Sequence, residues 1–199
     1  MRILIALLMI LPLAACFDAD VSMNFVDSET AEMNAVMTMG PELYAMGSQS
    51  GEDMCEDGEG VLADDGSYVC TISQVDTIDA LIAQSQTETE GKSAPTDVSQ
   101  GFTVERLDDD TVRVSFDLAT MMKDASEGKP EDLGEMEAML RAAFEGHAIT
   151  LNVSGAAIVE SNGEISEDGA TATFVLPMLA LLEDTVDLPE EFFTVVKTN

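Results

Sequence analysis

The chain has 199 residues, of which 46% are hydrophobic and 24% charged, with 8 Lys and Arg against 39 Asp and Glu. Apolar residues are frequent enough for a packed core, which excludes a chain that is disordered by composition. The formal charge of −31 excludes nucleic acid and bare anionic lipid as expected partners, because both would repel the protein. The charge suits salty surroundings, and an acidic docking surface is the alternative.

The first residues have the layout of a secretory signal. Arg2 precedes an apolar run over residues 3–13, which is shorter than the roughly 20 residues that a membrane-spanning helix needs. Pro12 would also disturb such a helix. We therefore expect residues 1–15 to be a leader that is removed on export.

The end of this leader indicates its type. Leu13-Ala14-Ala15-Cys16 resembles the lipobox of bacterial lipoproteins, in which small residues precede a cysteine whose thiol accepts a diacylglycerol. Cys16 is then the lipidated mature N-terminus, and its acyl chains anchor the protein to a membrane. The alternative is an ordinary cleaved signal with a chance cysteine. Phe17 stands where Asp would retain a lipoprotein in the inner membrane, which favours the periplasmic face of the outer membrane in a Gram-negative cell.

Export leaves residues 16–199, expected as one domain, and the loss of Arg2 changes the formal charge from −31 to −32. Cys55 and Cys70 enclose a loop of about 15 residues, across which a disulfide stabilises by roughly 3 kcal/mol in an oxidising compartment. Two free thiols are the alternative. A metal site is not expected, because no second Cys or His stands near either cysteine.

Polar and apolar residues alternate over residues 18–39, which predicts a β-hairpin that turns at 27–30. The methionines after its turn, together with one that follows the hairpin, suggest soft Cu(I) ligation as one interpretation. Most of them share the inward face of the strand, so core packing is the prediction. These residues are Met33, Met37, Met39 and Met46.

A short helix over 41–46 and a loop over 47–60 should follow, and then a smaller hairpin with strands around 61–62 and 68–72. Asp76 is expected to cap a short helix. The buried residues of that helix should be Ile78, Leu81 and Ile82. Residues 84–101 are polar and low in complexity, which predicts a flexible surface loop, with a subdomain boundary as the alternative.

A second large hairpin is predicted from residues 102–107 and 111–118. A helix should run over 131–145, after Pro130 and before Gly146. The last third alternates again, with strands expected around 149–153, 157–160, 171–176 and 192–197, and with tight-turn signals at Asn162-Gly163 and Asp168-Gly169. The prediction is an α+β fold, in which antiparallel β-hairpins form a sheet with two or more packed helices.

No catalytic site can be identified in this pattern. His147, the single histidine, follows a helix-ending glycine and is expected in a loop, and no nucleophile elbow accompanies it. The acidic stretches 52–59, 64–65 and 108–110 do not fit the calcium-loop pattern and are expected to be solvated turns. We expect no metal and no cofactor.

The C-terminal third carries a resemblance. Residues 149–163 (Ile-Thr-Leu-Asn-Val-Ser-Gly-Ala-Ala-Ile-Val-Glu-Ser-Asn-Gly) and 168–176 (Asp-Gly-Ala-Thr-Ala-Thr-Phe-Val-Leu) resemble the end of the LppM-type lipoprotein domain, and the lipobox followed by the strand at 20–25 fits its beginning. Phe174 stands where that family often has Trp. Some relatives carry a C-terminal membrane helix that this sequence lacks, so anchoring is expected at Cys16. The resemblance implies an α+β envelope domain without known enzymatic activity.

The leading interpretation is a non-enzymatic, membrane-tethered binding or structural module of the cell envelope. The apolar faces of the large hairpins and of the helix at 131–145 could enclose an apolar or lipid ligand, and a filled core is the alternative. One rival is a carboxylate-based hydrolase acting on glycosides, for which aromatic platforms are usual, whereas this chain has no Trp and only Tyr44 and Tyr68. Another is an acidic subunit that docks a partner in an envelope complex.

Overall fold

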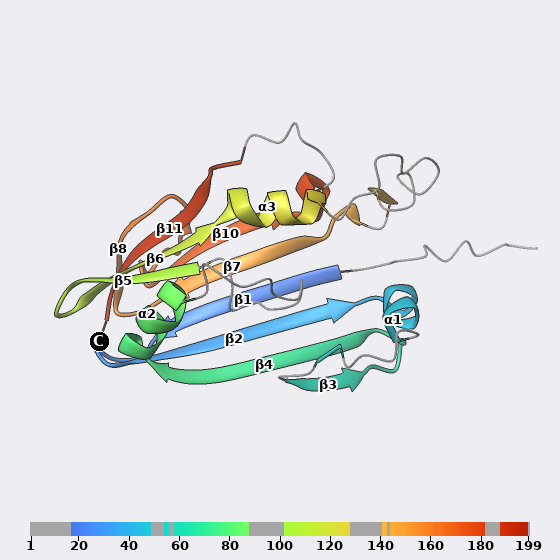
Figure 1. Cartoon of the computed structure of the whole chain (residues 1–199), viewed down its shortest axis with the longest axis horizontal. Helices are drawn as coiled ribbons and strands as arrows, with labels where there is room; N and C mark the ends of the chain where they lie inside the picture. Colours follow the sequence, from blue (N-terminus) through green and yellow to red (C-terminus); the bar gives the residue numbers. More distant parts are fainter. Residues whose placement is uncertain are drawn as a thin grey trace, which may run out of the picture.

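The computed structural model describes residues 17–48, 54–55, 58–87, 102–127, 141–142, 144–181 and 188–198. Within these residues, the elements with described bounds form two sheets and three α-helices, in agreement with the predicted α+β class. The larger sheet has the strand order β3-β4-β2-β1-β7-β10-β9, and the smaller has the order β5-β6-β11-β8 (Figure 1).

The elements have the following bounds. The larger sheet contains β1 (Phe17–Phe25), β2 (Thr30–Met39), β3 (Glu59–Leu62), β4 (Tyr68–Thr77), β7 (Ala148–Ser154), β9 (Glu164–Ile165) and β10 (Thr171–Pro177). The smaller sheet contains β5 (Phe102–Asp108), β6 (Thr111–Asp117), β8 (Ala157–Ser161) and β11 (Glu191–Lys197). The helices are α1 (Pro41–Gly47), α2 (Ile78–Thr87), α3 (Leu118–Glu127) and the short 3-10 helix η3 (Met178–Leu181).

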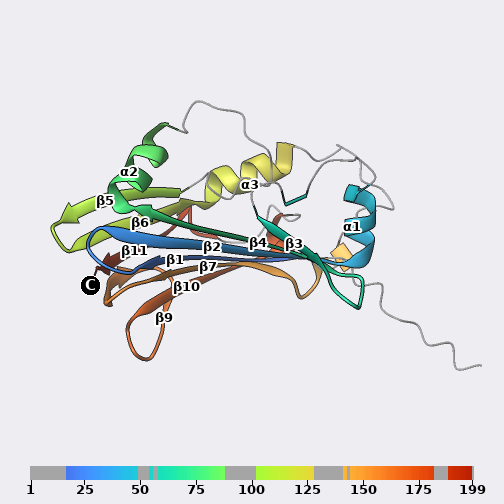
Figure 2. The same cartoon turned by 90° about the horizontal axis from the view of Figure 1, so that it is seen from below.

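The predicted first hairpin forms the centre of the larger sheet. β1 pairs with β2 in antiparallel orientation and with β7 in parallel orientation, so that Ala19 stands opposite both Met37 and Ile149. The alternating residues predicted to face inward do so, since Val21, Met23 and their alternate neighbours along β1 are buried. The helices and the strands β5 and β6 lie on this side of the sheet (Figure 2).

Aromatic rings join the two sheets. Phe192 of β11 is fully buried and stacks on Phe116 of β6 and on Phe174 of β10, with ring centroids 5.8 and 5.4 Å away. Because β10 belongs to the larger sheet and β11 to the smaller one, these contacts hold the inward faces of the two sheets together. Phe174 itself is partly buried and packs against the main core.

The turn between β1 and β2 is built by an aspartate. The Asp27 carboxylate accepts hydrogen bonds from the backbone N–H groups of Glu29 (2.8 Å) and Thr30 (2.7 Å), and these bonds, that of Glu29 first, lower its pKa from the usual 3.8. The Glu29 carbonyl in turn accepts the backbone N–H of Ile78 at 2.8 Å, which positions the start of α2 beside the turn.

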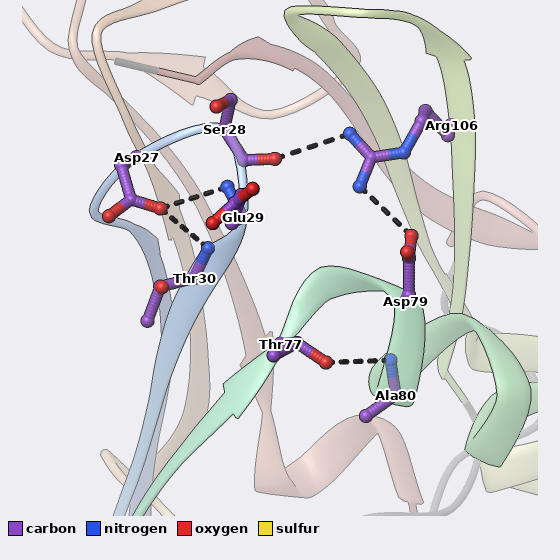
Figure 3. A network of polar contacts seen from close by, with 8 residues as sticks. All are labelled: Asp27, Ser28, Glu29, Thr30, Thr77, Asp79, Ala80 and Arg106. Atoms are coloured by element: carbon purple, nitrogen blue, oxygen red, sulfur yellow. Dashed lines mark hydrogen bonds and ion pairs between the residues drawn. The ribbon is translucent and has the colours of Figure 1, made fainter.

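The same corner corrects the prediction for the cap of α2 (Figure 3). Asp76 is a residue of β4, and the side chain that accepts a backbone N–H of the first helical turn is the Thr77 hydroxyl, at 3.2 Å. Arg106 of β5 closes the corner, because its guanidinium donates to the Ser28 carbonyl (3.3 Å) and to the Asp79 carboxylate (3.1 Å).

The strand prediction that ended at Leu118 was wrong by one residue, because Leu118 begins α3, a helix that the sequence pattern did not indicate. Asp117 caps α3, since one of its carboxylate oxygens accepts the backbone N–H of Thr120 and the other accepts the Thr120 hydroxyl, each at 2.8 Å.

The predicted helix over 131–145 lies mostly outside the described residues. Of its four described residues, 141, 142 and 144 are helical and 145 is in a turn, and Gly146 follows with a positive φ of 86°.

Two further expectations need correction. The predicted loop over 84–101 begins within α2, which continues to Thr87; the rest lies outside the described residues. Asn162-Gly163 is not a hairpin turn, because β8 pairs with β11 whereas β9 pairs with β10, so the chain crosses between the sheets there. A β-carbon on Gly163 would stand 2.6 Å from the Thr173 carbonyl oxygen, which explains the glycine.

Candidate functional site at the start of the first strand

The described body begins one residue after the expected lipidation site. Cys16 and residues 1–15 lie outside the described residues, whereas β1 begins at Phe17. At this end of the larger sheet β2 ends, α1 follows it, and β4 begins (Figure 1). The geometry here decides what stands next to an anchor on Cys16.

A histidine–carboxylate pair fastens the start of β1 to β7. His147 Nδ1 lies 2.8 Å from Asp18 Oδ2, and Asp18 Oδ1 accepts the backbone N–H of Ala148 at 3.1 Å. The His147 side chain is 19% exposed and lies between Gly146 and β7, in the loop position predicted for it. Sequence reasoning missed the partnership, because no local signal links residues 129 positions apart.

The predicted disulfide is present, and it packs against the start of β1. Cys55 and Cys70 are bonded to each other, and both are buried. Cys70 stands opposite Met37, which stands opposite Ala19, and the three residues belong to one buried cluster with Cys55. The bridge therefore ties the segment before β3 to β4, which pairs with β2.

The methionines lie in the packed interior, as predicted. Met37 and Met39 are each 4% exposed, and Met33 is partly buried against the main core. The side chain of Met46 lies outside the described residues.

An aromatic pair lies at the same end of the sheet. Tyr44 of α1 and Tyr68 of β4 stack with ring centroids 4.5 Å apart and ring planes 10° apart. Tyr68 stands opposite Met39 on one side and Leu62 on the other, and Leu62 is 59% exposed. A β-carbon on Gly60 would overlap the Tyr68 phenol, so the Tyr68 ring can occupy this position only because residue 60 has no side chain.

In the acidic turns, aspartate carboxylates accept hydrogen bonds from residues of the same turn. Asp65 accepts the Ser67 hydroxyl (2.7 Å) and N–H (3.0 Å), and these bonds lower its pKa. The pKa of Asp108 is also lowered, chiefly by a hydrogen bond from the Thr111 hydroxyl. Within the described part of the chain no three His, Cys, Asp or Glu side chains are grouped to hold a metal ion. Most of the acidic stretch 52–59 lies outside it.

No carboxylate of the described residues is buried. Among the described residues, the buried polar side chains are the threonines Thr111, Thr194 and Thr198. The resolved carboxylate pKa shifts there are all downward, whereas a carboxylic acid that donates a proton near neutral pH needs a raised pKa.

Comparison with known proteins gives one structural match. No family model matches the chain, and no curated protein matches its sequence. Among solved structures, the folded domain of LppM from Mycobacterium tuberculosis, determined by NMR, is similar over 94% of this chain and 92% of that chain, with 10% sequence identity and a TM-score of 0.48. That domain is of the type that the C-terminal pattern resembles. None of the helices in the described ranges has the length and apolar character needed to span a membrane.

Proposed function

We propose that this chain is a lipoprotein of the bacterial cell envelope, anchored to a membrane by diacylglycerol on Cys16. The observation that carries the proposal is the position of the lipobox relative to the fold. The lipobox places the cleavage site before Cys16, and β1 pairs with β2 from Phe17 onward. Cleavage there leaves the central hairpin intact. The Cys55–Cys70 disulfide agrees with export to an oxidising compartment.

The proposed role is that of a non-enzymatic binding or structural module whose partner is a lipid or an envelope protein. The apolar faces of the two large hairpins pack on each other, since Val21 and Met23 of β1 share one buried cluster with Val112 and Val114 of β6. A ligand enclosed between those two faces is therefore not part of the proposal. Partner binding is instead placed on the surface of the body.

The test is the mass of the mature protein. The full chain with its own leader is expressed in a Gram-negative host and extracted from membranes, which are separated into inner and outer fractions. We expect an N-terminal Cys16 that carries diacylglycerol, in the outer-membrane fraction. The Cys16→Ser variant should lose both the lipid and the membrane association. An unmodified sulfur on Cys16, or a leader still attached, would contradict the proposal.

A further inference from the structure

We propose that the sheet end at which β1 begins rests on the bilayer, with an aromatic and apolar rim in contact with the interface of zwitterionic lipid. The rim consists of Phe17, Tyr44, Leu62 and Tyr68. This inference rests on the proposed function, because lipidation of Cys16 is what brings the rim to the membrane.

The first step is the absence of a linker. Phe17 already belongs to β1 and stands opposite Met39 of β2. Consecutive Cα atoms are about 3.8 Å apart, so the anchored Cys16 has no length of chain with which to hold the body away from the bilayer. Whatever side chains surround the start of β1 must therefore meet the headgroup region.

The second step is the register across the sheet. Phe17 stands opposite Met39, Met39 opposite Tyr68, and Tyr68 opposite Leu62, so one row crosses four strands without a charged residue. Strands are spaced about 4.8 Å apart, which puts Leu62 roughly 15 Å from Phe17. Tyr44 stacks on Tyr68 from α1, which follows directly on β2. The apolar row therefore extends sideways from the residue next to the anchor.

The third step is the chemistry of the rim. Tyrosine has an apolar ring and a polar tip, which suits it to the boundary between headgroups and acyl chains. Leu62 is 59% exposed to water, and contact with the interface removes that apolar surface from water. A single exposed leucine needs no explanation, but Leu62 lies beside a stacked tyrosine pair, and Phe17, Tyr44 and Tyr68 are each partly exposed. These four side chains provide the contact surface, whereas Met39 of the same row is buried.

The fourth step is charge, which selects the lipid. Glu42 of α1 and the turn residues Asp64 and Asp65 are exposed at this end, and β1, α1, β3 and β4 contain no Lys or Arg. The hydrogen bonds from Ser67 lower the pKa of Asp65 further below the neutral range. Anionic headgroups repel such an edge over a Debye length of about 10 Å at 0.1 M salt, whereas zwitterionic headgroups do not.

The composition of the chain provides the probe. It contains no Trp, and its only tyrosines are Tyr44 and Tyr68, so intrinsic tyrosine emission comes from the rim alone. Purified lipidated protein is incorporated into phosphatidylcholine vesicles with and without a headgroup-attached nitroxide lipid, which quenches emission at short range. We expect emission to fall with the nitroxide, because interfacial tyrosines lie at headgroup depth. Anionic phosphatidylglycerol vesicles at low salt should reduce this quenching.

A pair of matched variants identifies the surface. Leu62→Asp puts a charge into the rim, and we expect it to abolish most of the quenching while the protein still floats with the vesicles. Val159→Asp makes a comparable change at a site of 57% exposure on β8, in the other sheet, and should leave quenching unchanged. Equal emission with and without nitroxide, from protein that carries lipid and floats, would overturn the inference alone. Protein that carries no lipid and does not float would overturn the proposed function with it.

Discussion

Removal of the Cys55–Cys70 disulfide should destabilise the sheet by an amount that can be worked out from the chain. The bridge spans a sequence separation of 15, for which loop-closure entropy corresponds to about 3 kcal/mol. Both cysteines are buried, so replacing both by alanine removes apolar contacts worth roughly 1 kcal/mol more. The double variant C55A/C70A should therefore lose about 4 kcal/mol, which for a body of this size lowers Tm by roughly 10 °C.

The assay is urea and thermal unfolding of the body from Phe17 onward, exported behind a leader without a lipobox and followed by circular dichroism. Three samples are compared: oxidised protein, the same protein with a reducing agent, and C55A/C70A. Reduction should cost about 3 kcal/mol, since it opens the loop and keeps the sulfur atoms in place. The reducing agent should not change the double variant. Equal midpoints for the oxidised and reduced protein would refute the reasoning.

Three further outcomes are expected. Phe192→Ala should lower the free energy of unfolding in urea by about 4 kcal/mol, because the fully buried Phe192 ring joins the two sheets. Phe193→Ala is the control: the Phe193 ring is half-buried, its centroid lies 4.2 Å from the Arg113 guanidinium, and its loss should cost about 1 kcal/mol. Thr77→Ala should cost about 1 kcal/mol through the lost cap of α2, and equal losses for Thr77→Ala and Asp76→Ala would contradict the assignment of the cap. The folded-state pKa of Asp27 lies below 3.8, so its stabilisation is present above pH 3.8 and is lost as pH falls through the lowered value. Asp27→Asn keeps an acceptor oxygen and does not titrate, so acid titration of unfolding should show the parent losing stability relative to this variant below pH 3.8.

The strands could be predicted because most of them bury one face. Alternation located β1, β2, β5 and β6 to within one or two residues, since each packs one face on the core and exposes the other. The disulfide followed from the number of cysteines and the expected compartment. Both kinds of information are present in a short window of sequence or in its composition.

The remaining features depend on partners that are distant in sequence. Nothing near Ala19 indicates that it pairs in parallel with Ile149, and the Asp18–His147 contact follows from that pairing. The division into two sheets was missed for the same reason, because a turn signal at Asn162-Gly163 does not say which strands it joins. The helix α3 was not predicted, because its only clear start signal, Asp117, stands at the end of an alternating strand.

The acidity of the chain has a partly structural origin. In each of four turns an aspartate accepts the backbone N–H of the residue two positions later, and in each the pKa of that aspartate is lowered; these aspartates are Asp27, Asp65, Asp108 and Asp168. An ionised carboxylate accepts such bonds more strongly than a neutral amide, so these turns favour aspartate whatever the protein binds. Charge of this kind is not a sign of a docking surface. A docking role for the acidic surface must therefore be sought in carboxylates that make no bond to their own backbone. Glu42 beside the rim is one of these, and the effect we propose for it is to exclude anionic lipid.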